Sequence, residues 1–205
     1  MRPHAVSAGS RRTLAAHCHP ARYPGRLSLL LTNVRGMTPD AAAKYFWHEA
    51  PVAEGLEITQ VYGYLICPRT GRVLIQDDEG KFNLPGGTPE SFDADLVDTL
   101  VREAFEENQV VVSDAVYLGY QEVHRPRREP YAQVRMVGLI GAFEQRQPDP
   151  DNGRTYRRLM TSLAEAPKVL GWGEPAVAQV KLAARIAEEA WGVPVGSPEP
   201  TGYVD

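Results

Sequence analysis

Three glutamates and an arginine near the middle of the chain have types and spacing that suit metal-assisted chemistry. Glu103, Glu106 and Glu107 lie three and four residues apart in a predicted helix, so they share one face with Cβ atoms about 5–6 Å apart. Such crowding of like charges is unfavourable unless a positive charge lies among them. Magnesium takes hard oxygen ligands and is held by one or two carboxylates together with substrate phosphates. The pattern therefore indicates a divalent-cation site on this helix.

The residues around these carboxylates predict how they are positioned. A tight turn at Pro85-Gly86-Gly87 precedes the helix, and glycine lets a backbone turn sharply and approach a site closely. A plain solvated face on a surface helix is the alternative, but a glycine pair at this distance favours the metal site. The other helix face is predicted to be buried, because apolar residues recur there at helical spacing: Leu96, Val97, Leu100, Val101 and Ala104.

The stretch from Gly86 to Val110 resembles the signature of the Nudix hydrolase family, G-x5-E-x7-R-E-U-x-E-E-x-G-U, in which U is a bulky apolar residue. Residues 102–107, REAFEE, match its second half. Ala94 stands at the position of the first glutamate of the signature. Gly87 lies one residue further from Arg102 than the signature requires, so the loop between them is one residue longer than in the signature. Gln109 stands where the signature has a glycine after the helix, so a different exit turn is expected.

This resemblance implies an α/β fold, a Nudix-like α/β/α sandwich with a mixed sheet, here with N-terminal and C-terminal helical extensions. It also implies hydrolysis of a diphosphate linkage in a nucleoside diphosphate derivative, such as a nucleotide sugar, ADP-ribose or a nucleoside triphosphate. The cofactor would be Mg²⁺, with Mn²⁺ as a substitute. Glu103, Glu106 and Glu107 would be metal ligands and catalytic residues. Arg102 is also assigned to the catalytic set, and we expect it to hold the helix by pairing with one of three nearby acids: Asp93, Asp95 or Asp98.

Two alternatives to a pyrophosphohydrolase come from the same fold. One is a Nudix-like sensor or binding domain for nucleotide metabolites, without catalysis; the intact carboxylate cluster argues against it. The other is a Nudix-fold isomerase acting on an alkyl diphosphate. That chemistry normally needs a cysteine in a set context, and Cys67 has no such context.

Further residues are candidates for binding the substrate or for activating water. A Pro-flanked basic segment could hold phosphates through forked hydrogen bonds. Trp172 could stack on a base. The full set of predicted substrate-binding residues is Gly86, Gly87, Arg125, Arg127, Arg128 and Trp172. The general base is left open among Glu122, Glu129 and Glu174.

The hydropathy pattern predicts the elements that carry these residues. Period-two runs rich in β-branched and aromatic residues predict strands at 58–67, 72–76, 110–112, 115–124 and 131–143. Helices are predicted at 38–48, where Thr38-Pro39-Asp40 has the form of a helix start, at 156–166 and at 175–191. The segment at 148–154 is predicted to be a turn rather than a calcium loop, since the closing glutamate is missing.

Composition limits the class of protein and its surroundings. The chain has 205 residues, 43% of them hydrophobic, and a net charge of −4. Residues 1–36 carry six arginines and no acid, so the remainder is acidic, which argues against nucleic-acid binding. The chain has no run of eighteen apolar residues, so no membrane span is predicted. The two cysteines do not suggest a disulfide framework, which suits a cytoplasmic protein.

The predicted organisation is a single domain with appendages. Residues 1–36 form a basic, flexible tail, and 37–57 a helix with a linker that also offers a surface for a homodimer. Residues 58–192 are the Nudix hydrolase domain with its C-terminal helices, and 193–205 a flexible tail.

Overall fold

The computed structural model describes residues 43–196 and 199–205. Nine strands and three helices follow one another along this part of the chain. The strands are β1 (Lys44–His48), β2 (Glu57–Ile66), β3 (Val73–Asp78), β4 (Lys81–Asn83), β5 (Gly86–Gly87), β6 (Val110–Arg125), β7 (Arg128–Phe143), β8 (Arg157–Thr161) and β9 (Gly202–Val204). The helices are α1 (Leu96–Asn108), α2 (Ala166–Leu170) and α3 (Glu174–Trp191).

The strands form one mixed sheet in the order β1-β6-β7-β2-β3-β8-β9. Strands β2 and β7 are parallel, whereas the other pairs are antiparallel. Strand β2 meets β3 only at Ile66 and Val73. Further down, β5 takes the place of β3 beside β2, and β3 pairs with β4 instead. The sheet therefore forks beside β2, and the candidate site is built at this fork.

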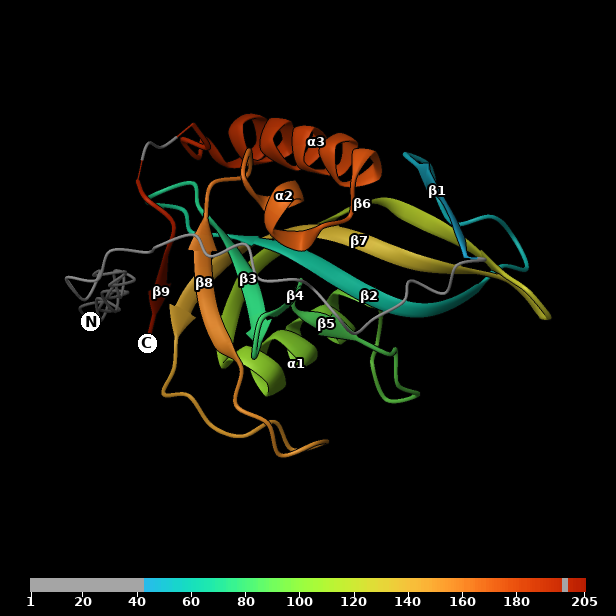
Figure 1. The fold of residues 1–205 in the computed structure, drawn as a ribbon, viewed down its shortest axis with the longest axis horizontal. Coiled ribbons are helices and arrows are strands. Elements are labelled where there is room, and N and C mark those ends of the chain that lie inside the picture. Colours follow the sequence, from blue (N-terminus) through green and yellow to red (C-terminus); the bar gives the residue numbers. More distant parts are fainter. Residues whose placement is uncertain (1–42, 197–198) are drawn as a thin grey trace, which may run out of the picture.

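Helices cover both faces of the sheet, with α1 on one side and α2 and α3 on the other (Figure 1). Two apolar cores follow from this layering. Leu100 and Ala104 of α1 are buried against one face, whereas Val180, Ala183 and Ala187 of α3 are buried against the other. The predicted α/β/α sandwich with a mixed sheet is confirmed. None of the helices in the described part of the chain combines the length and apolar character needed to cross a membrane.

The helix predicted at 38–48 is wrong where it can be compared, because Lys44–His48 is strand β1; residues 38–42 lie outside the described residues. Three consecutive aromatic residues, Tyr45 to Trp47, favour a strand. The strand lies antiparallel along β6, with Phe46 opposite Glu122. Strand pairing therefore outweighs the helix-start signal at Thr38.

The helix predicted at 156–166 is also wrong, since Arg157–Thr161 is strand β8 between β3 and β9. The predicted flexible tail at 193–205 contains β9, which pairs with β8 from Arg158 to Met160. The Tyr203 hydroxyl donates a hydrogen bond to Asp77 at 2.6 Å, which fixes this tail to the sheet.

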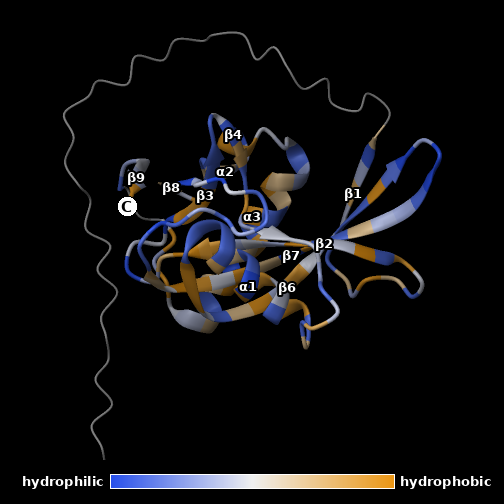
Figure 2. Cartoon of the chain, turned by 90° about the horizontal axis from the view of Figure 1, so that it is seen from below, coloured by the Kyte–Doolittle hydropathy of each residue, from blue (hydrophilic) through white to orange (hydrophobic). Residues whose placement is uncertain are grey.

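The predicted strands at 110–112 and 115–124 are one strand, β6, whose pairing with β7 is interrupted by register shifts. Together with β1, the β6–β7 hairpin extends from the body of the domain (Figure 2). The predicted turn at 148–154 and the helix predicted at 175–191 are both confirmed.

Candidate active site

Two glycines bring the backbone of β5 against the carboxylates of α1. Gly86 pairs with Tyr62 and has φ +142°, and a Cβ there would lie 2.0 Å from the carbonyl oxygen of Val61. A Cβ on Gly87 would lie 2.4 Å from the carboxylate of Glu103. Both positions therefore require glycine, for strand pairing at the first and for the approach of Glu103 at the second.

Glu107 lies in the fork of the sheet, where it contacts both branches. Its Oε2 accepts a hydrogen bond from the backbone N–H of Gly86 at 2.9 Å, and its Oε1 accepts one from Gln76 Nε2 at 3.3 Å. Burial raises the pKa of Glu107 from 4.5 to about 8, although both hydrogen bonds oppose the rise. The nearby Glu103 and Asp149 charges add to it. Without a cation, this carboxyl group therefore favours its protonated form at neutral pH.

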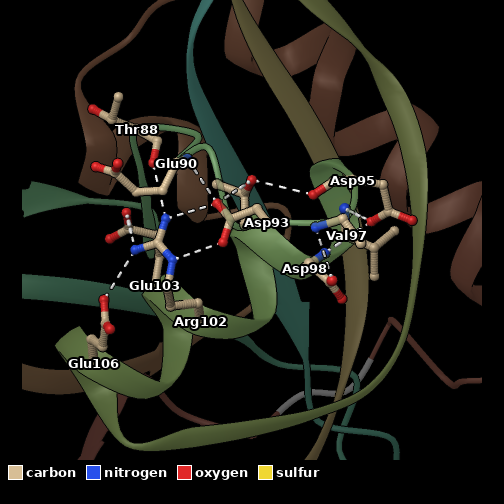
Figure 3. Close-up of polar contacts among 11 residues, drawn as sticks. Thr88, Glu90, Asp93, Asp95, Val97, Asp98, Arg102, Glu103 and Glu106 are labelled. Atoms are coloured by element: carbon tan, nitrogen blue, oxygen red, sulfur yellow. Dashed lines mark hydrogen bonds and ion pairs between the residues drawn. The ribbon is translucent and has the colours of Figure 1, made fainter.

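Arg102 supplies the positive charge among the other carboxylates (Figure 3). Its Nη1 donates to Glu103 at 2.9 Å and to Glu106 at 3.1 Å. Its Nε and Nη2 donate to the two oxygens of Asp93, each at 3.0 Å, and Nη2 also reaches the carbonyl oxygen of Thr88. The guanidinium therefore fastens the loop before α1 to the helix.

The expectation that Arg102 pairs with a nearby aspartate is confirmed, and the partner is Asp93 (Figure 3). This hydrogen-bonded pair holds the pKa of Asp93 well below its usual range. The other two candidates act on the backbone. Asp95 is the N-cap of α1, with its side chain accepting from two backbone amides, and Asp98 accepts from the amide of Ala94.

The expected change in the exit turn of α1 is wrong. Gln109 takes the left-handed conformation at φ 45° and ψ 49°, which a glycine would adopt there without strain. Its side chain offsets the strain by hydrogen bonding on both sides. Nε2 donates to the carbonyl oxygen of Glu106 at 2.9 Å, and Oε1 accepts from the backbone N–H of Gln147 at 3.0 Å.

The carboxylates on α1 fit a hard cation in their chemistry and in their surroundings. Glu103 and Glu106 each give one oxygen to Arg102 and keep the other without a hydrogen-bond partner in the described part of the chain. The missing Cβ of Gly87 leaves space beside Glu103. Within residues 43–196 and 199–205, however, no three His, Cys, Asp or Glu side chains are already grouped to hold a metal ion.

Two further carboxylates lie near this cluster, in the segment at 148–154 that the sequence predicts to be a turn. Burial raises the pKa of Glu103 and of Glu107, and the Asp151 and Asp149 charges, respectively, add to these rises. Asp149 is buried and organises the turn by accepting hydrogen bonds from the amide of Asp151 and the side chain of Asn152. Asp151 is exposed. The only sequence signal was an acidic pair after a long strand, and its position beside α1 follows from the return of the chain into β8.

The predicted phosphate-binding arginines lie elsewhere. Arg125, Arg127 and Arg128 are at the tip of the β6–β7 hairpin, away from α1 in both views (Figure 1, Figure 2). The guanidinium of Arg128 lies 4.2 Å from the ring centroid of Tyr131. Trp172 lies between α2 and α3, with its ring centroid 6.4 Å from that of Tyr62.

The three predicted general bases are also separate from α1 in their contacts. Glu122 pairs with His48 at 3.1 Å and also contacts His124, on the β1–β6 part of the sheet. Glu129 is exposed at the start of β7, and Glu174 is exposed at the first turn of α3. The acids whose charges act on the helix carboxylates are therefore Asp149 and Asp151 rather than these residues.

Fold and site together define a Nudix-type domain, and comparison with known proteins gives the family. The NUDIX domain model matches residues 57–179, which is more than half of the chain. The chain belongs to the Nudix family. No curated protein is similar enough to count as a relative.

Solved structures are similar to this chain at low sequence identity. A NUDIX hydrolase from Nitrosomonas europaea is 18% identical over 64% of this chain and 90% of its own, with a TM-score of 0.48. The NUDIX domain of NrtR from Shewanella oneidensis, crystallised with ADP-ribose, is 19% identical over 64% of this chain and 93% of its own, with a TM-score of 0.44. A mutant form of the Bacillus subtilis pyrophosphohydrolase BsRppH is 20% identical over 50% of this chain, with a TM-score of 0.40; the alignment spans only 62% of that protein.

Proposed function

We propose that this protein is a Mg²⁺-dependent Nudix pyrophosphohydrolase that cleaves a diphosphate linkage in a nucleoside diphosphate derivative. The observation that carries the proposal is the position of Glu107 beside Gly86, within a family domain whose helix presents two more carboxylates. A buried carboxyl group with a raised pKa at such a fork is typical of a functional site rather than a solvated surface.

Glu103, Glu106 and Glu107 would hold the divalent cation through carboxylate oxygens. When bound, the cation would neutralise charge on the phosphoryl oxygens and lower the pKa of a coordinated water. Glu107 must lose its proton to become a ligand, so metal binding would release a proton. Arg102 acts as a positioning residue, because its bonds to Asp93 and Thr88 hold the loop against the helix.

Asp151 is a stronger candidate for the general base than Glu122, Glu129 or Glu174. Its charge acts on Glu103, and its side chain is exposed. The other three acids contact different parts of the fold. An exposed carboxylate next to the proposed cation could accept a proton from the attacking water.

A substrate panel tests the proposed function. Purified protein with Mg²⁺ is given nucleoside triphosphates, ADP-ribose, nucleotide sugars and dinucleoside polyphosphates, and phosphatase-coupled phosphate release is measured. We expect one class to be cleaved, with activity abolished by EDTA and by Glu107→Gln. Binding of the same compounds without any product release would refute the enzyme and support a sensor.

A further inference from the structure

A buried arginine on the α3 side of the sheet has no carboxylate partner in the described part of the chain. Arg135 of β7 is 2% exposed. Its Nη1 donates to the carbonyl oxygens of Gln133 and Val134, and its Nη2 donates to the Gln121 side chain at 3.0 Å. Its Nε is buried and has no acceptor among the described residues. A buried cation with an open donor is costly unless something binds it.

A second open donor lies in the same part of the core. Gln179 of α3 is fully buried, and its Oε1 accepts a hydrogen bond from the Tyr64 hydroxyl at 2.9 Å. Its Nε2 has no acceptor among the described residues. Tyr64 and Arg135 are diagonal neighbours on β2 and β7, because Tyr62 is directly opposite Arg135. Both open groups are donors, so a ligand that contacted both would have to supply acceptors.

Trp172 covers this arginine and stands between two glycines. The guanidinium of Arg135 lies 5.0 Å from the ring of Trp172 and 4.8 Å from the ring of Tyr62. Trp172 stands between Gly171 at φ +67° and Gly173 at φ +68°. No atom lies within 4 Å of a Cβ built on either glycine, so neither glycine is required by close packing. This Gly-Trp-Gly segment joins α2 to α3 and is suited to act as a hinge.

The arginine is two strands away from the β5 backbone of the candidate active site. Tyr62 pairs with Gly86 on one side and with Arg135 on the other. Neighbouring strands are about 4.8 Å apart, so the backbones of Gly86 and Arg135 are about 10 Å apart. Burial raises the pKa of Tyr62, and the Glu107 charge adds to the rise, which agrees with this proximity. A nucleoside diphosphate with its diphosphate at Glu107 could therefore extend across β2 toward Arg135.

We propose that Arg135 and Gln179 recognise the base of the substrate, with Trp172 moving off the guanidinium to stack on that base. This inference rests on the proposed function and adds a base preference to it. Two donors fit guanine, which presents O6 and N7 as adjacent acceptors. Adenine offers an amino group and one acceptor on the same edge, so it leaves one donor unpaired. Uracil, with a single carbonyl group on that edge, should be intermediate.

The test is a binding measurement that does not depend on catalysis. Isothermal titration calorimetry of the full chain in EDTA compares GDP, UDP and ADP. We expect GDP to bind about tenfold more tightly than ADP, with UDP between them. Equal affinities, or tighter binding of ADP, would overturn the inference. Binding is measured in EDTA, whereas turnover is measured with Mg²⁺ in the substrate panel, so the two results are independent. A base preference without turnover would contradict only the proposed hydrolase. Turnover without a base preference would contradict only this inference.

Variants then assign the preference to residues. Arg135→Met should reduce the GDP-to-ADP affinity ratio to about one. Arg157→Met is the matched control, because Arg157 also stacks on a tyrosine, Tyr203 at 3.6 Å, but on β8, and it should keep the ratio. GDP should change the tryptophan fluorescence of the wild type, and Trp172→Phe should remove that change. If Arg135→Met does not fold, Gln179→Leu provides the same comparison, and an unchanged ratio there would contradict the proposal.

Discussion

Replacing Glu107 by glutamine separates the chemistry of the site from its contribution to folding. The folded-state pKa of Glu107 is about 8, against an ordinary value of 4.5. Between these values the folded protein binds a proton that the unfolded chain does not, so metal-free stability falls as the pH rises from 4.5 to 8. At 1.36 kcal/mol for each pKa unit, the full cost is at most about 5 kcal/mol.

Glutamine removes this cost but loses part of the hydrogen bonding. Its amide oxygen can still accept from Gly86, whereas its amide nitrogen faces the nitrogen of Gln76. A lost bond to a charged group costs about 1.5–3 kcal/mol, so we expect a net stabilisation of about 2 kcal/mol above pH 8. For a chain of this size that is a rise in Tm of about 4–8 °C. Below pH 4.5 the stabilisation should disappear.

Thermal unfolding in EDTA at pH 4.5 and pH 8.5, with turnover measured in Mg²⁺ at pH 8, tests both parts. Turnover should fall at least about a hundredfold, which corresponds to about 2.7 kcal/mol or more. Wild-type protein should regain stability when Mg²⁺ is added, and the variant should regain much less. A variant that is less stable than wild type at pH 8.5, or one that retains turnover, would refute the assignment of Glu107 as a buried metal ligand.

Four further changes test the scaffold of the site and the C-terminal strand. Gly87→Ala should displace Glu103 and lower turnover at least about tenfold, with little effect on Tm. Gly86→Ala should lower Tm, because its Cβ would meet the backbone of Val61. The reverse pattern would contradict the roles given to the two glycines. Asp93→Asn should cost about 2 kcal/mol in urea unfolding at pH 7. Because the pKa of Asp93 is depressed, this stabilisation is present above pH 3.8 and is lost as the pH falls through the folded-state pKa, so an equal deficit in strong acid would argue against it. Deleting residues 199–205 should cost about 2 kcal/mol or more, because β9 and the Tyr203 bond to Asp77 are lost, and unchanged stability would restore the flexible-tail interpretation.

Local patterns in the sequence predicted the parts of the site that lie close together along the chain. Helical spacing placed Glu103, Glu106 and Glu107 on one face, and the glycine pair predicted a close backbone approach. The pairing of Arg102 with a nearby aspartate was also predictable, because both residues lie within one loop and the helix that follows it. These features depend on backbone geometry over a few residues, which a single sequence specifies well.

Long-range strand pairing could not be predicted in the same way. Strands β1, β8 and β9 form because β6, β3 and β8 respectively offer edges to pair with. This tertiary context outweighed local helix and tail signals at His48, Arg157 and Tyr203. The left-handed turn at Gln109 survives without glycine because side-chain bonds hold it on both sides.

The family, the carboxylate helix and the glycine turn were therefore predictable from residues close together in the chain. The distant residues around them depend on how the sheet assembles. In the folded chain, Asp149 and Asp151 lie near α1, the basic tip of the β6–β7 hairpin lies away from it, and Arg135 is buried beneath Trp172. The physical reason is that such neighbours are set by how strands assemble into one sheet, and no local pattern along the chain records that assembly.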